Sequence, residues 1–223
     1  MKGSRPRNSS YTATVQSAIV DAPVVFGGTF DPIHIGHIEA AKSVSTLLGN
    51  VTVRMMLAGN PRLRKAAPEK IEHRWQMLQI ACADVEKLVP DDTEMHDTRA
   101  TVTVETIEKL GGDRHKPVIW VLGDDAAVNI ANWIRYETIR QKASLLILKR
   151  ANVCLEKVSR DFELVDAPLE LAFEAGRIYI YRDSVLDISA TKIRNKISQN
   201  ESVARWLHPG VLAYIIDTHL YQT

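Results

Sequence analysis

Residues 27 to 37 read Gly-Gly-Thr-Phe-Asp-Pro-Ile-His-Ile-Gly-His, and this stretch decides both the fold and the chemistry that the chain can support. It follows a short apolar run at 23–26, which is typical of a buried strand that ends in a tight turn. From residue 36 to residue 48 apolar side chains recur at helical spacing, which predicts a helix. The stretch therefore joins a strand to a helix through a glycine-rich turn.

The glycines and histidines of this stretch suit a phosphate ligand. Gly27 and Gly28 let the backbone approach a ligand closely, and Gly36 opens a helix whose first amides and dipole attract an anion. His34 and His37 are three residues apart, so both imidazoles can face the side where a nucleotide's phosphates would lie. A hydrogen bond to a charged group contributes about 1.5 to 3 kcal/mol, enough to stabilise charge in a transition state. The alternatives are a zinc site, for which the segment offers no third ligand, and a purely structural turn.

The rest of the chain alternates between strand-like and helix-like segments. Strands are expected at 51–57, 93–96, 118–122, 145–148 and 177–181, and helices at 69–82, 104–110, 191–198 and 209–220. That alternation predicts an α/β fold: a Rossmann-like, doubly wound parallel sheet with a small C-terminal helical subdomain. In such a sheet the ligand is expected at the carboxyl ends of the strands, near the point where the strand order reverses.

The composition excludes several kinds of partner. Lys and Arg number 28 against 27 Asp and Glu, so a formal net charge of +1 gives no overall field for binding nucleic acid or an acidic membrane. With 223 residues and 45% apolar content, the chain suits one α/β domain with a small appendage. Cys82 and Cys154 form no Cys-x-x-Cys pair and are expected to be inert thiols, and no apolar run approaches the roughly 18 residues of a membrane span. These features favour a cytoplasmic protein.

A second cluster that suits an anion is Ile188-Ser189-Ala190-Thr191-Lys192-Ile193-Arg194. Ser189 is expected to be the N-cap of a helix, and its hydroxyl, that of Thr191 and the first amides could bind an anion one turn before Arg194. The alternative is a plain capped helix with a solvated basic face. Two helix starts suited to phosphate in one domain favour a triphosphate that reaches both.

At these residues the chain resembles the nucleotidyltransferase superfamily with a His-x-Gly-His signature and, within it, the bacterial nicotinate-nucleotide adenylyltransferases. The resemblance covers residues 24 to 221. It rests on 27–37 and 188–194, with support from Gly123-Asp124-Asp125, Asn132-Trp133, Tyr136-Glu137 and Leu207-His208-Pro209. It implies adenylyl transfer from ATP to nicotinate mononucleotide, which would give nicotinate adenine dinucleotide and pyrophosphate for NAD biosynthesis, with Mg²⁺ as the cofactor on the phosphates.

The resemblance also implies a role for each residue that matches a motif. The residues expected to act on the reacting phosphates are His34, His37 and Arg194. Those expected to bind ATP are Gly27, Gly28, Thr29, Phe30, Gly36, Gly123, Asp125, Ser189 and Thr191. Those expected to bind the acceptor are Asp31, Arg62, Lys65, Thr103 and Trp133. No protein-bound metal is implied. Asp125 could instead cap a helix, and Trp133 could belong to the core.

Composition and the resemblance together divide the chain into three parts. Residues 1–21 are expected to form a flexible tail that is basic up to residue 20, with a transit peptide as the alternative. Residues 22–185 would form the nucleotidyltransferase domain, and residues 186–223 a helical subdomain that completes the ATP site. The expected partners are ATP and a pyridine mononucleotide, with no nucleic acid and no membrane, and a homo-oligomer is left open.

The acceptor half of the sequence departs from the family pattern. The chain has Thr101-Val102-Thr103 where many members carry an aromatic residue in the middle, and Trp133-Ile134 where many have Trp-Tyr. The loop at 60–65 contains three cations, which suit an acceptor phosphate or equally an exposed loop. Nicotinamide mononucleotide is therefore an alternative acceptor. Phosphopantetheine is another, although its enzymes commonly have Thr at the first signature histidine.

Two other interpretations remain for the signature. His-Ile-Gly-His at 34–37 also matches class I aminoacyl-tRNA synthetases, but the chain offers no segment for an anticodon or editing domain. The other interpretation is a regulatory module that binds a nucleotide without catalysis. The intact His34, His37 and Arg194 argue against it, since a site that loses its activity should lose these residues first.

Overall fold

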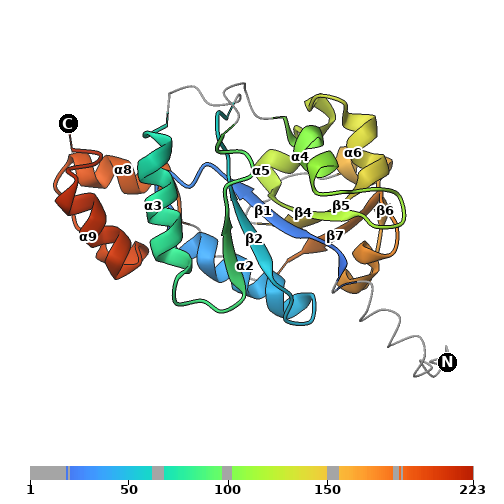
Figure 1. Ribbon diagram of the computed structural model, residues 1–223, viewed down its shortest axis with the longest axis horizontal. Helices are drawn as coiled ribbons and strands as arrows, with labels where there is room; N and C mark the ends of the chain where they lie inside the picture. Colours follow the sequence, from blue (N-terminus) through green and yellow to red (C-terminus); the bar gives the residue numbers. More distant parts are fainter. Residues whose placement is uncertain are drawn as a thin grey trace.

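A computed structural model describes residues 19, 21–61, 68–96, 102–149, 156–182, 186 and 188–222. Within these residues the strands form a seven-stranded parallel sheet in the order β3-β2-β1-β4-β5-β7-β6 (Figure 1). The strands are β1 (Val24–Gly28), β2 (Val53–Leu57), β3 (Leu88–Asp91), β4 (Val118–Gly123), β5 (Ala143–Leu148), β6 (Glu163–Leu164) and β7 (Arg177–Tyr181). The order runs outward in both directions from β1 and β4, which confirms the doubly wound α/β prediction.

Helices cover both faces of this sheet. Buried residues of α2, α3 and α9 pack on one face, and those of α4 and α6 pack on the other. The helices are α2 (Ile35–Leu47), α3 (Ile71–Cys82), α4 (Thr103–Lys109), α5 (Asp124–Ala127), α6 (Tyr136–Lys142), α7 (Glu156–Asp161), α8 (Ala190–Ser198) and α9 (Pro209–Asp217). Short 3₁₀ turns are η1 (Ile130–Asn132), η2 (Pro168–Ala172) and η3 (Ala204–Trp206). In the described part of the chain, no helix has the length and hydropathy to cross a bilayer.

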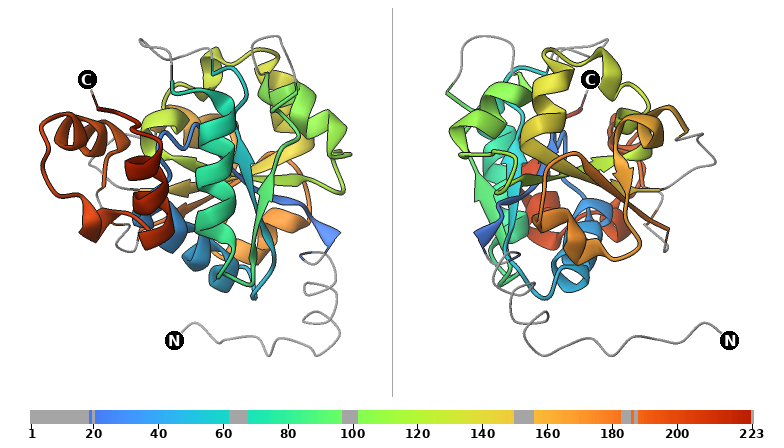
Figure 2. Two further views of the ribbon diagram at one scale, coloured as in Figure 1. Left: turned by 60° about the vertical axis from the view of Figure 1, so that its left-hand side comes forward. Right: turned by 90° about the vertical axis from the view of Figure 1, so that its right-hand side faces the viewer.

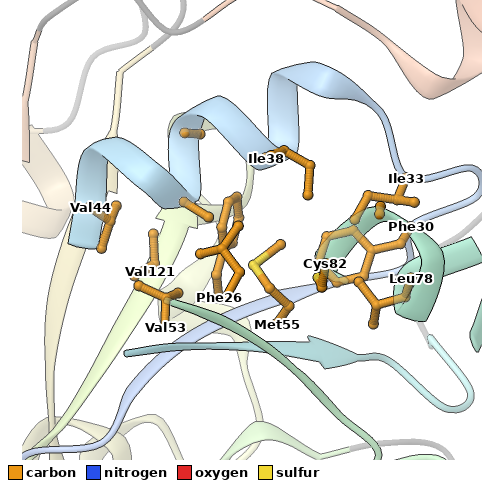
Figure 3. Close-up of a cluster of buried hydrophobic side chains, with 14 of the residues drawn as sticks. Phe26, Phe30, Ile33, Ile38, Val44, Val53, Met55, Leu78, Cys82 and Val121 are labelled. Carbon is orange, nitrogen blue, oxygen red and sulfur yellow. The ribbon is translucent and has the colours of Figure 1, made fainter. Parts of the chain in front are cut away.

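The pleat of β1 divides the apolar side chains between two cores. Val24 and Phe26 lie in the core under α2, and Val25 lies in the core on the other face. Figure 3 shows Ile38 of α2 near Phe26 and Met55 of the sheet. Because both faces are buried, the strands are almost continuously apolar, which is why the sequence pattern identifies them.

Helix α3 closes the first core at the end that carries the loop after β1. Leu78 and Cys82 of α3 lie beside Phe30 in Figure 3. Burial raises the pKa of the Cys82 thiol to about 12, so it stays protonated at neutral pH and is a poor nucleophile. This agrees with the inert role expected from the sequence. Cys154 lies outside the described residues.

The C-terminal helices pack beside α3 (Figures 1 and 2). Val211 and Ile215 of α9 lie in the same core as β1 and α2. The Tyr214 hydroxyl and His73 Nδ1 on α3 share a hydrogen bond of 2.8 Å. The division of the chain at residue 186 stays a prediction, but the core is continuous across it.

The prediction of a strand at 93–96 is wrong. The strand lies earlier, at β3, and residues 93–96 form a turn that the Asp91 carboxylate closes by accepting from the Thr93 N–H at 2.9 Å. Pro90 obscures β3 in the sequence because proline is depleted in strands. It is tolerated there because β3 lies at the edge of the sheet. Helix α6 and the elements between β5 and β7 were not predicted.

Arg74 of α3 fixes the loops that follow β1 and β2. It is 1% exposed, and its guanidinium donates to four carbonyl oxygens. Nη1 donates to Thr29 at 3.0 Å and to Ala58 at 2.9 Å, Nη2 to Gly59 at 3.0 Å, and Nε to Glu69 at 2.9 Å. Only a planar fork of this kind can serve several buried acceptors at once. The two loops are therefore held against one helix.

Replacement of Arg74 by methionine should lower the free energy of unfolding by about 3 kcal/mol or more, because it leaves several buried carbonyls without a donor. Urea denaturation measures this change. Arg74→Lys should recover only part of the loss. Lys42→Met is the matched control, since it breaks an exposed pair with Glu39 that contributes about 1 kcal/mol at most. Equal stability of Arg74→Met and Lys42→Met would contradict the assignment.

Candidate active site

A cavity of about 380 Å³ opens at the carboxyl ends of β1 and β4. These are the two strands between which the strand order reverses. The cavity is lined by Gly27, Gly28, Thr29, Ala58, Pro61, Glu94, Val102, Thr103, Trp120, Leu122, Ala126, Asn132, Trp133 and Ile134. It therefore lies where the topology of the sheet predicts a ligand site.

An ion pair outside the cavity joins two of its walls. Arg135, which follows Trp133 and Ile134, donates from Nη1 at 3.0 Å and from Nη2 at 2.8 Å to the two carboxylate oxygens of Glu108. Glu108 lies on α4, the helix that begins with Thr103. The hydrogen bonds from Arg135 lower the pKa of Glu108. The pair is exposed and adds little stability, but its two-point contact fixes the relative position of the walls.

His34 and His37 form a stacked pair where α2 begins. Their ring centroids are 3.7 Å apart, and the ring planes differ by 21°. His34 is buried, and His37 is half-buried. The backbone N–H of His34 donates to Nδ1 of His37 at 3.3 Å. A ring nitrogen that accepts carries no proton, so the donor of a neutral His37 ring is Nε2.

Phe30 packs against the half-buried histidine. Its ring meets the His37 ring edge to face, with centroids 5.1 Å apart, and lies 6.3 Å from that of Phe26. The φ angle of Phe30 is 47°, in the left-handed region that bulky residues rarely adopt. The Phe30 ring also occupies the space beside Gly28, where an added Cβ would lie 2.6 Å from it. The glycine is therefore required for the position of Phe30.

Asp31 joins the loop after β1 to two C-terminal segments. Arg194 of α8 donates from Nη1 to the Asp31 carbonyl oxygen at 2.6 Å and lies 3.5 Å from Oδ2. The Tyr221 hydroxyl donates to Oδ1 at 2.9 Å, and the Glu69 N–H donates to the same oxygen at 3.3 Å. Asp31 is 2% exposed and is not among the described residues that line the cavity. Its predicted role at the acceptor stays a prediction.

The start of α8 lies against the start of α2. A Cβ added at Gly36 would lie 3.3 Å from the carbonyl oxygen of Leu186. Arg194 Nη2 donates to the Thr191 hydroxyl at 3.3 Å. Ser189 is the N-cap residue, as predicted, but its side chain makes no capping hydrogen bond, and both hydroxyl residues are exposed. The two segments that suit phosphate are therefore neighbours.

The other predicted residues fall into three groups. Gly27, Gly28, Thr29, Thr103 and Trp133 line the cavity. Gly123 ends β4 and is the N-cap residue of α5, and an added Cβ there would lie 2.6 Å from Oδ1 of Asp125. Arg62 and Lys65 lie outside the described residues. The functional roles assigned to all these residues stay predictions.

The sequence analysis missed Glu94 and Trp120 as cavity-lining residues. Glu94 is buried, and its carboxylate accepts from the Thr106 hydroxyl at 2.6 Å. A carboxylate that follows a strand would have been a candidate for the ligand site. Because the strand was predicted at 93–96, Glu94 was placed inside it and was not considered. Trp120 was assigned to a strand interior, although its ring would lie 3.3 Å from a Cβ at Gly27.

Comparisons with known proteins agree with this architecture. The family model described as cytidylyltransferase-like matches residues 25–196. A Citrobacter koseri protein named "Probable nicotinate-nucleotide adenylyltransferase" is 31% identical over 209 residues, which cover 89% of this chain and 97% of that protein. An Escherichia coli O139:H28 protein of the same name is 29% identical over 207 residues, with the same two coverages.

Solved structures show the same fold. The nicotinic acid mononucleotide adenylyltransferase of Plasmodium falciparum, complexed with NaAD, has a TM-score of 0.69 at 19% identity and covers 90% of this chain and 97% of that one. The same protein complexed with APC has a TM-score of 0.68 at 20% identity, with equal coverage. These likenesses support the Rossmann-like arrangement of the strands and helices.

Replacement of Gly28 by alanine should lower the free energy of unfolding by about 1 to 3 kcal/mol, because the new methyl group overlaps the buried Phe30 ring. Gly27→Ala is the matched control, since its Cβ would meet the Trp120 ring at the milder distance of 3.3 Å. Thermal and urea unfolding compare the two variants. A Gly28→Ala protein at least as stable as Gly27→Ala would show that Phe30 is free to move.

Proposed function

Because the chain belongs to the cytidylyltransferase-like family, we propose that it transfers the adenylyl group of ATP to nicotinate mononucleotide. The products would be nicotinate adenine dinucleotide and pyrophosphate. The observation that carries the proposal is the contact of Arg194 with Asp31, which joins the histidine loop to α8 at the end of the sheet. The name of the bacterial relatives supports the choice of acceptor.

The proposed reaction is a displacement at the α-phosphorus of ATP. An oxygen of the acceptor phosphate forms the new bond to this phosphorus, and the bond to the bridging oxygen of the β-phosphate breaks, so that pyrophosphate leaves with that oxygen. The attacking oxygen is already anionic, and therefore no base has to remove a proton. Catalysis then consists of positioning the two phosphates and stabilising charge as it moves to the leaving group.

His37 and Arg194 are the proposed donors to the ATP phosphates. The His37 Nε2–H suits this role because Nδ1 already accepts from the backbone. The Arg194 side chain is 26% exposed, so part of its guanidinium remains accessible to an anion. Buried His34, stacked on His37, would fix the plane of the outer ring. Preorganised donors of this kind stabilise a transition state at no cost of reorientation.

The remaining ATP contacts are proposed at the ends of strands and helices. Gly36 and the first amides of α2 would receive one phosphate, and Ser189 and Thr191 at the start of α8 another. In this arrangement the segment 186–223 completes the ATP site. Asp125, exposed beside Gly123, would accept from a ribose hydroxyl. Its alternative role as a helix cap has less support, since Gly123 occupies the N-cap position.

We propose that Mg²⁺ binds with ATP rather than in a protein cage. Among the described residues no group of three or more His, Cys, Asp or Glu side chains could hold a metal ion. Magnesium keeps several waters and commonly binds substrate phosphates, which fits a site whose proposed ATP contacts are donors. When bound, the ion would neutralise charge on the phosphates.

The cavity beside β1 and β4 is the proposed acceptor site. Trp133 would stack on the pyridine ring, and Thr103, at the start of α4, lines the same cavity. The Trp133 indole N–H is buried and has no hydrogen-bond partner in the part of the chain that the structure describes. Arg62 and Lys65 are the proposed contacts of the acceptor phosphate.

One feature favours nicotinamide mononucleotide as a second candidate acceptor. The buried Glu94 carboxylate lines the cavity, and Thr106 donates to one of its oxygens. A carboxylate oxygen can accept from the amide of a nicotinamide ring, whereas the ionised carboxylate of a nicotinate ring has no proton to donate to it. The relatives' name favours nicotinate, so the two acceptors must be compared directly.

We expect pyrophosphate release when the protein is incubated with ATP, Mg²⁺ and nicotinate mononucleotide, and a lower kcat/KM with nicotinamide mononucleotide. A coupled pyrophosphate assay measures both. The reverse preference would assign the second acceptor, and release only with phosphopantetheine would overturn both. Tight ATP binding without turnover on any acceptor would favour a regulatory module instead.

Replacement of His37 by alanine should lower kcat by about 10² to 10³, the scale for loss of one donor to a transition state. Trp133→Ala serves as the contrasting variant, because it should raise KM for the acceptor and leave KM for ATP nearly unchanged. Steady-state kinetics with each substrate varied separates the two effects. An unchanged rate in folded His37→Ala would remove His37 from the mechanism.

A further inference from the structure

Tyr221 is bound to the active-site loop, but none of the roles proposed above uses it. It follows α9 and lies 190 positions from Asp31, yet its hydroxyl donates to Asp31 Oδ1 at 2.9 Å. Its side chain is half-buried and packs against the core that contains β1 and α2. A hydrogen bond to a buried carboxylate beside Arg194 is in a position to influence the site.

The two oxygens of the Asp31 carboxylate have different surroundings. Oδ1 accepts from the Tyr221 hydroxyl at 2.9 Å and from the Glu69 N–H at 3.3 Å. Oδ2 faces Arg194 Nη1 at 3.5 Å, longer than a hydrogen bond. The guanidinium donates instead to the Asp31 carbonyl oxygen at 2.6 Å. The carboxylate is therefore turned with Oδ2 toward the cation and with Oδ1 toward the Tyr221 hydroxyl.

We propose that Tyr221 is a positioning residue for ATP, which acts through Asp31 on Arg194. By holding Oδ1, the phenol prevents the carboxylate from turning both oxygens toward the guanidinium. Arg194 then remains anchored by the backbone carbonyl and by Thr191, and it presents the rest of its positive charge to the triphosphate. This inference rests on the proposed role of Arg194 in ATP binding.

Loss of the phenolic hydroxyl should have a specific consequence. The Asp31 carboxylate could rotate about its Cβ–Cγ bond and accept two hydrogen bonds from Arg194, which is the preferred geometry of such a pair. A guanidinium paired in this way is drawn toward Asp31 and carries less charge toward an anion. ATP binding should weaken, whereas acceptor binding at Thr103 and Trp133 should not change.

The hydroxyl keeps its proton throughout the range of enzyme assays. Burial and the negative charge of Asp31 raise the pKa of Tyr221 far above its usual range. The group is therefore always a donor to Asp31. The effect of removing the hydroxyl should therefore not change between about pH 6 and pH 9. Even an unperturbed phenol, with a pKa of about 10, stays mostly protonated in that range.

The test uses the full chain with Tyr221→Phe, which keeps the ring and removes the hydroxyl. Calorimetric titration with ATP and Mg²⁺ should show a dissociation constant for ATP that is about tenfold larger, and KM for ATP should rise by the same factor. KM for the acceptor should stay within about twofold. Tyr214→Phe is the matched control: its hydroxyl also holds a C-terminal helix, but to His73 of α3, and ATP binding should be unchanged.

A double-mutant cycle distinguishes positioning from a structural role. In an Arg194→Gln background, Tyr221→Phe should change ATP affinity by less than about twofold, because its effect passes through the guanidinium. A full additional loss in that background would overturn the proposal, as would unchanged ATP affinity in Tyr221→Phe, an equal loss for both substrates, or a variant that fails to fold. Unmodified protein that binds ATP without transferring an adenylyl group would overturn the proposed reaction alone.

Discussion

The guanidinium of Arg74 is the constraint on which the rest of the site depends. Arg74 is buried, and from one side chain it supplies donors to the carbonyl oxygens of Thr29, Ala58 and Gly59 in the loops after β1 and β2. The residue after Thr29 is Phe30, whose ring supports His37. The orientation of the histidine pair thus depends on a hydrogen-bond network that begins on α3. The role of this buried arginine is to hold the two loops in place through hydrogen bonds.

Asp31 extends that network to the other end of the chain. Asp31 accepts hydrogen bonds from the segment before α3, from α8 and from the turn after α9. Its carboxylate and carbonyl oxygen therefore help to position three helices. Because α9 also shares the core with β1 and α2, the C-terminal helices are held by packing as well as by polar contacts. The position of Asp31 is therefore set by the sheet on one side and by the packing of the C-terminal helices on the other.

The sequence predicted most of the fold because the strands of a sheet buried on both faces are short apolar runs, and the helices between them keep their spacing. It failed at β3, where Pro90 breaks the pattern, and at α6, which begins after Arg135 in a left-handed conformation and buries only Ile139. The phosphate-suited stretches could be found because their chemistry is local. The contacts of Asp31 could not, since Glu69, Arg194 and Tyr221 lie 38, 163 and 190 positions away and no sequence pattern pairs them with Asp31. Glu94 was missed because the misplaced strand at 93–96 included it.

The link from Asp31 to Arg194 and Tyr221 spans 163 and 190 positions, which has a consequence during synthesis on the ribosome. The strand and the histidine loop leave the exit tunnel early, and the parallel sheet can begin to form around them. The Asp31 carboxylate meets Arg194 and Tyr221 only after the residues from α8 to Tyr221 have been translated. Until then, the loop that carries the histidine pair lacks these two contacts and is held by the earlier elements alone.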